Sequence, residues 1–87
     1  MSKINKILLK LLSGASDSNI DFNDVQYLLE HLNFKLRIKG SHYIFYRNDI
    51  TEIINLQPTE NNKTKTYQVK QIRNLVIKYK LGELSDD

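Results

Sequence analysis

Cysteine is absent from this 87-residue chain, so it can form neither a disulfide framework nor a thiolate metal site. No apolar run approaches the roughly 20 residues that a membrane-spanning helix needs. The basic and apolar opening segment resembles a signal peptide only superficially, because Lys6 and Lys10 interrupt it. We therefore expect a cytoplasmic protein with no membrane partner, whose opening segment is a soluble amphipathic helix.

The motifs of several enzyme classes are also missing. The chain contains no glycine-rich phosphate loop, no Ser-His-Asp set at a suggestive spacing, and no cluster of His and Asp with metal-ligand spacing. We therefore expect no metal and no cofactor. Of the two histidines, His31 lies off the apolar face of a predicted helix and is expected to be an ordinary surface residue.

Positive charge is concentrated in one part of the chain. The formal net charge is +3, but residues 34–80 hold ten basic and three acidic side chains, an excess of seven positive charges. A dense positive segment is typical of a protein that binds a polyanion. A solvated lysine-rich surface has the same composition, so charge alone leaves both interpretations open.

The spacing of apolar residues predicts three helices and three strands. Helices are expected at residues 3–13, 22–32 and 67–80. Strands are expected at 34–39, 42–47 and 51–57. Asp21 is the expected N-cap of the second helix, with Asp24 completing a short-armed capping box, and Asn33 is expected to be left-handed at its end.

This order predicts an α+β domain of two layers, in which two helices cover one face of a three-stranded antiparallel sheet. The domain is expected at residues 20–81, after an additional N-terminal helix and loop at 1–19. Residues 82–87 form a polar tail that is expected to fray. The other face of the sheet would be bare, with Lys35, Arg37 and Lys39 of the first strand on it.

His42 follows the predicted turn Gly40-Ser41 at the start of the second strand. An imidazole can give and accept a proton near neutral pH, and nearby cations can bind a scissile phosphate. Neighbouring tyrosines can stack on unpaired bases. Alternatively, the aromatic residues are core and His42 merely begins a strand. Alternation places His42, Ile44 and Tyr46 on one face and Tyr43, Phe45 and Arg47 on the other, without indicating which face is buried.

Two segments resemble the HicA toxin family. Residues 32–36 followed by 39–45 are similar to a Leu-Gly-Phe segment that leads to Gly-Ser-His and an apolar strand. Residues 55–57 (Asn-Leu-Gln) and 67–71 (Tyr-Gln-Val-Lys-Gln) are similar to a version of the family with a Pro-Tyr-Gln-Val-Arg-Gln helix start. The resemblance covers about residues 21–81. Asn33 replaces the usual glycine, which its left-handed tolerance makes harmless. Tyr43 replaces a frequent second histidine, so a mechanism with paired imidazoles is in doubt.

The resemblance implies a fold like that of the double-stranded-RNA-binding domain, metal-independent cleavage of mRNA, and a HicB-like antitoxin partner. It makes His42 the catalytic histidine. The expected RNA contacts are Arg37, Lys39, Gly40, Ser41, Lys63, Lys65, Lys70 and Arg73. Lys39, Tyr43 and Tyr46 are all candidates for a second proton-transfer group. The competing interpretations are a non-catalytic RNA-binding module and a protein-interaction domain with an acidic partner.

Overall fold

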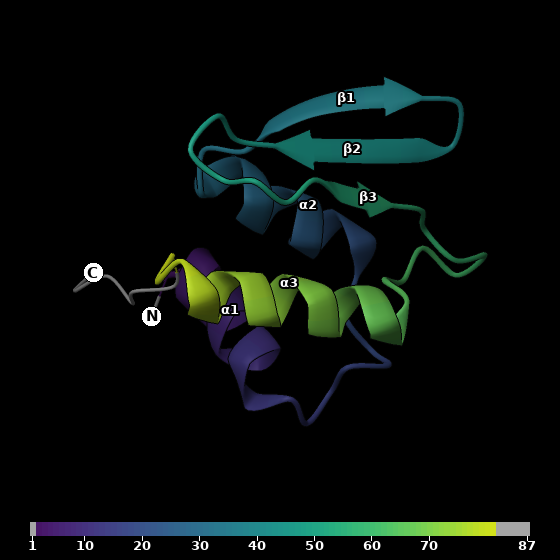
Figure 1. Cartoon of the computed structure of the whole chain (residues 1–87). Helices are drawn as coiled ribbons and strands as arrows, with labels where there is room; N and C mark the ends of the chain where they lie inside the picture. Colours follow the sequence, from purple (N-terminus) through teal and green to yellow (C-terminus); the bar gives the residue numbers. More distant parts are fainter. Residues whose placement is uncertain (1, 82–87) are drawn as a thin grey trace.

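The computed structural model describes residues 2–81, which form three helices and one three-stranded sheet (Figure 1). The elements are α1 (Lys3–Ser13), α2 (Phe22–His31), β1 (Lys35–Lys39), β2 (His42–Tyr46), β3 (Ile54–Leu56) and α3 (Thr66–Lys78). This order confirms the predicted α+β fold with its additional N-terminal helix. The tail that was expected to fray, residues 82–87, lies outside the described residues.

The ends of the helices follow from local backbone chemistry. Helix α1 ends at Gly14, which has a φ of 71°. Asp21 is the N-cap residue of α2, but its side chain does not cap the helix, so the predicted capping box with Asp24 is wrong. The carboxylate of Asp21 instead accepts a hydrogen bond from Lys63. Helix α2 ends at His31 with Leu32 as its C-cap residue, and Asn33 follows in the predicted left-handed conformation, with a φ of 69°.

The sheet is a meander in the order β1-β2-β3, with both neighbouring pairs antiparallel. Lys39 pairs with His42, so Gly40 and Ser41 form a two-residue turn. Gly40 has a φ of 62°, and a glycine with positive φ at the first turn position is the signature of a type II′ hairpin. This turn places His42 at the first position of β2.

Two helices cover one face of the sheet, and α1 packs against them from the far side (Figure 1). Phe45 of β2 is fully buried in this core. The ring of Tyr43 meets the ring of Phe22 edge-on, with centroids 4.9 Å apart. Tyr43 and Phe45 therefore face the helices. Because side chains alternate along a strand, His42, Ile44 and Tyr46 face the opposite side, which answers the question that alternation had left open.

No helix within residues 2–81 combines the length and the apolar character that crossing a bilayer requires.

Glu52 joins the segment before β3 to the end of α3. Its carboxylate accepts hydrogen bonds from Lys78 Nζ at 2.8 Å and from the Tyr79 hydroxyl at 2.5 Å. The bond from Lys78, followed by that from Tyr79, lowers the pKa of Glu52 from its ordinary 4.5 to about 2. The carboxylate thus stays ionised in the folded protein at a pH where it is protonated in the unfolded chain.

We expect Glu52→Gln to lower the melting temperature at pH 7. Because the pKa of Glu52 is lower in the folded state than in the unfolded chain, the carboxylate contributes fully to the free energy of unfolding above about pH 4.5. This contribution disappears as the pH falls towards 2. Thermal melts at several pH values should therefore show the variant and the parent converging in acid. Glu60→Gln, at an exposed loop position, is the matched control. A difference in melting temperature that does not change with pH would contradict this role.

Candidate active site

The face of the sheet that no helix covers, called here the open face, carries alternate residues of all three strands and one residue of the segment directly before β3. Its residues are Lys35, Arg37, Lys39, His42, Ile44, Tyr46, Ile53 and Asn55. In the register of the sheet, Lys39 lies directly opposite His42, and Arg37 lies opposite Ile44. Lys39 is therefore the cross-strand neighbour of the exposed imidazole, while Arg37 and Lys35 lie farther along β1 on the same face.

The imidazole of His42 is hydrogen-bonded to the third strand. Its Nδ1 lies 3.1 Å from Oδ1 of Asn55. The preceding residue, Ser41, accepts a hydrogen bond through Oγ from Gln57 Nε2 at 3.1 Å. The Asn-Leu-Gln segment, which is the end of β3 and the residue after it, thus contacts both the serine and the histidine of the Gly-Ser-His segment. Sequence reasoning singled out this segment only as part of a family pattern and did not place Asn55 in the site.

A groove of about 610 Å³ lies on the open face beside His42. It is lined by Arg37, Ile44, Tyr46, Arg47, Ile50, Thr51, Ile53 and Asn55. Asn55 both lines this groove and contacts the imidazole, so the two features are contiguous. The groove combines apolar and aromatic walls with two guanidinium groups, which suits a flat, partly polar ring.

The expected RNA contacts do not all gather around His42. Arg37 and Lys39 lie on the open face, and Gly40 and Ser41 form the adjoining turn. Lys65 is the N-cap residue of α3, and Lys70 is exposed on that helix. These last two come from the element that covers the other face of the sheet.

Lys63 and Arg73 are engaged by acidic side chains. Lys63 pairs with Asp21. Arg73 holds both carboxylate oxygens of Asp17, at 2.8 and 3.1 Å, and also donates to the carbonyl of Leu11 at 3.2 Å. Hydrogen bonding by Arg73 lowers the pKa of Asp17, so this pair remains charged. Both cations tie structural segments together, Arg73 by fastening α3 to α1 and its following loop.

The candidate groups for a second proton transfer lie at different distances from His42. Lys39 is its direct cross-strand neighbour on the same face. Tyr46 shares the face but lies four residues along β2, or about 13 Å at the usual rise of a strand. Tyr43 faces the helices and packs against Phe22. The geometry therefore favours Lys39 over the two tyrosines.

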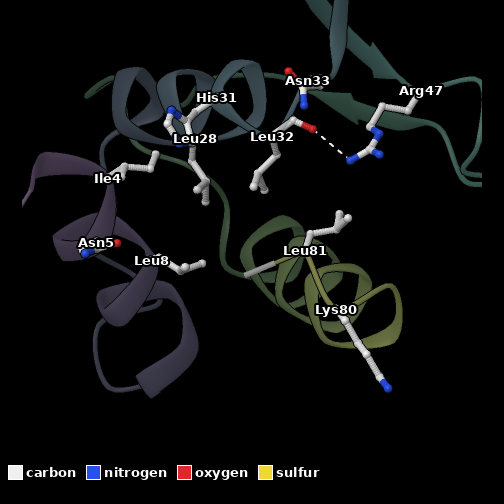
Figure 2. Close-up of a pocket in the computed structure, with 10 residues that line it drawn as sticks. All are labelled: Ile4, Asn5, Leu8, Leu28, His31, Leu32, Asn33, Arg47, Lys80 and Leu81. Atoms are coloured by element: carbon white, nitrogen blue, oxygen red, sulfur yellow. Dashed lines mark hydrogen bonds between the residues drawn. The ribbon is translucent and has the colours of Figure 1, made fainter. Parts of the chain in front are cut away.

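A second cavity, of about 350 Å³, lies where α1, α2 and residues 80–81 meet (Figure 2). Apolar side chains of α1 and α2 form much of its wall, and His31 lies at α2 beside them. Arg47 closes one side by donating to the Leu32 carbonyl at 2.9 Å. His31 is exposed and stacks on Tyr27, with ring centroids 6.5 Å apart. The two histidines thus belong to separate surfaces of the protein.

Comparison with known protein families gives a match to the HicA toxin of bacterial toxin–antitoxin systems over residues 22–79. No curated protein and no solved structure matches the chain. The family match begins with α2, ends just after α3, and includes the whole open face, while α1 lies outside it. Since the matched segment makes up about two-thirds of the chain, the protein belongs to the HicA family of toxins from bacterial toxin–antitoxin systems.

Proposed function

We propose that this toxin is an endoribonuclease that cleaves mRNA in the cytoplasm, with His42 as its catalytic residue and a HicB-like protein as its antitoxin. The observation that carries the proposal is the position of His42. Its imidazole is exposed on the open face, directly across the strand pair from Lys39. A proton carrier and phosphate-binding cations are therefore combined on a surface that an RNA strand can reach.

The chemistry that suits this arrangement uses the 2′-hydroxyl of the RNA itself. His42 takes the proton from the 2′-hydroxyl while O2′ attacks the adjacent phosphorus. The bond from phosphorus to the 5′ oxygen breaks, and that oxygen must gain a proton. Lys39, as the nearest cationic neighbour of His42, is placed to bind the phosphate and to donate this proton to the leaving 5′ oxygen. The products are a cyclic 2′,3′-phosphate and a free 5′-hydroxyl.

The groove beside His42 suits an unpaired nucleobase. Tyr46 provides an aromatic ring, Ile44 and Ile53 provide apolar walls, and Arg37 provides a cation that can also meet a phosphate. Protein aromatic rings and guanidinium planes stack on bases that have left a helix, whereas paired bases are inaccessible to them. We therefore propose that the substrate is single-stranded where it is cut.

The proposal is tested by incubating the purified protein with a single-stranded RNA while its binding is measured in parallel. Cleavage that produces cyclic phosphate ends supports the endoribonuclease. RNA that is bound and recovered intact would favour the non-catalytic RNA-binding module. Absence of RNA binding would favour the protein-interaction domain.

We expect EDTA to leave the rate of cleavage unchanged. His31 and His42 lie on different elements, and within residues 2–81 no three His, Cys, Asp or Glu side chains are grouped so that they could hold a metal ion. The measurement compares cleavage with and without EDTA, followed by addition of Mg²⁺ or Mn²⁺. Activity that is lost on chelation and restored by either ion would disprove the metal-free mechanism while leaving RNA as the substrate.

A further inference from the structure

Asn55 contacts the imidazole of His42 through an atom that can only accept hydrogen bonds. Its carboxamide oxygen lies 3.1 Å from Nδ1 of the ring. For this contact to be a hydrogen bond, Nδ1 must carry the hydrogen. A neutral ring that is protonated at Nδ1 has its lone pair at Nε2. Asn55 thereby selects the tautomer in which Nε2 can accept a proton from a substrate.

The position of Asn55 is determined by the core beneath it. Its neighbours in β3, Ile54 and Leu56, are both fully buried, so alternation turns the carboxamide of Asn55 to the open face. The buried side chain of Gln68 donates from Nε2 to the backbone carbonyl of Asn55 at 3.4 Å. β3 is therefore attached to α3 at the very residue that contacts His42.

A second contact, made just after the end of β3, steadies the turn before His42. Gln57 lies two residues after Asn55 and donates to Ser41 Oγ at 3.1 Å. Ser41 of the turn and the ring of His42 are thus held by Gln57 and Asn55, across 16 and 13 positions of sequence. This arrangement gives a physical reason why the Asn-Leu-Gln, Gly-Ser-His and Tyr-Gln-Val segments occur in one chain.

We infer that Asn55 is a positioning residue for His42, and this inference rests on the proposed catalytic role of the histidine. Asn55 holds the ring with Nδ1–H directed at its carboxamide oxygen and Nε2 available to the 2′-hydroxyl. It does not itself touch the reacting atoms. Its removal should lower the fraction of His42 in the productive tautomer and orientation. RNA binding through the cations of β1 should stay unchanged.

The test compares Asn55→Ala and Asn55→Asp with the parent protein. Asn55→Ala removes the acceptor, and we expect cleavage at saturating RNA to slow roughly three- to tenfold, the range that one ordinary hydrogen bond accounts for. Asn55→Asp keeps an acceptor and should restore much of the rate. Because a carboxylate stabilises the protonated imidazole, Asn55→Asp should also move the acidic limb of the pH–rate profile to higher pH.

The tautomer is measured independently of activity, from the ¹⁵N resonances of the His42 ring in the RNA-free protein. We expect Nδ1–H to dominate in the parent and in Asn55→Asp, and to decrease in Asn55→Ala. Asn61→Ala, an identical change in an exposed loop, should alter neither the rate nor the resonances.

An unchanged tautomer and rate in Asn55→Ala, with an unshifted pH profile in Asn55→Asp, would overturn the inference even though the parent cleaves RNA. If the parent binds RNA without cleaving it, the proposed catalytic function fails instead. The ring resonances would then still show whether Asn55 holds the histidine. The two failures are therefore distinguishable.

Discussion

Replacing His42 by alanine is expected to slow RNA cleavage by about 10²- to 10⁴-fold, the usual contribution of general acid–base catalysis. The fold should tolerate the change, because the side chain is exposed on the open face. Substitutions at exposed positions usually change the free energy of unfolding by no more than about 0.5 kcal/mol. RNA affinity should also remain, since we propose that the phosphate contacts are made by Lys39 and the other cations of β1.

The measurement pairs thermal melting with RNA cleavage on the same preparation. His31→Ala is the matched control, since it removes the other exposed imidazole from a separate surface. It should cleave at the parental rate. Expression in a host without antitoxin provides a second readout, because His42→Ala should no longer arrest growth. A His42→Ala variant that melts like the parent and still cuts RNA at the parental rate would exclude the site assignment.

The order of the elements was predictable because the spacing of their apolar residues follows the periods of helices and strands. Where some strands begin and end depends instead on hydrogen bonds that this spacing does not predict. β1 begins one residue later than predicted because the N–H of Phe34 bonds to the carbonyl of Leu29 and closes α2. β2 ends at Tyr46 because the carbonyl of Arg47 accepts from Ile50 in a turn. The third strand is reduced to Ile54–Leu56 and pairs only with β2.

The candidate site was predictable where its members are close in sequence. Alternation placed Arg37 and Lys39 together, and the Gly-Ser-His segment singled out His42. Which face His42 occupies depends on where the helices pack. The contact between Phe22 and Tyr43 shows that Tyr43 faces the helices, and the sequence alone does not predict this contact. The contact with Asn55 requires the β2–β3 register, and no local pattern contains it.

The number of basic residues in the segment 34–80 is larger than the number of cations that are free to bind a polyanion. Four of the ten cations between residues 34 and 80 are paired with carboxylates, some across long stretches of sequence. These pairs are Arg47–Asp49, Lys63–Asp21, Arg73–Asp17 and Lys78–Glu52. The partner acids of Lys63 and Arg73 lie before residue 34, outside the basic segment. A count of charge along the chain could not show that these cations are already engaged.

RNA affinity is therefore expected to fall with salt less steeply than the composition suggests. If Lys35, Arg37 and Lys39 are the cations that meet phosphates, the slope of log affinity against log salt should be about −2, at roughly −0.7 per contact with a single strand. Affinity would then drop roughly twentyfold between 50 and 200 mM salt. Ten engaged cations would instead give a slope of about −7. Titrations at several salt concentrations distinguish these cases.

Single variants identify which cations make the contacts. Arg37→Ala should make the slope shallower by roughly 0.7 and weaken binding to different RNA sequences alike, because phosphate contacts position the strand without reading its bases. Lys6→Ala, on the exposed side of α1, should leave the slope unchanged. Arg73→Ala should lower the melting temperature, because it leaves the carboxylate of Asp17, only 11% exposed, without its partner, yet it should not alter the slope. A slope that responds to Arg73 and not to Arg37 would move the RNA from the open face to the helical side of the protein.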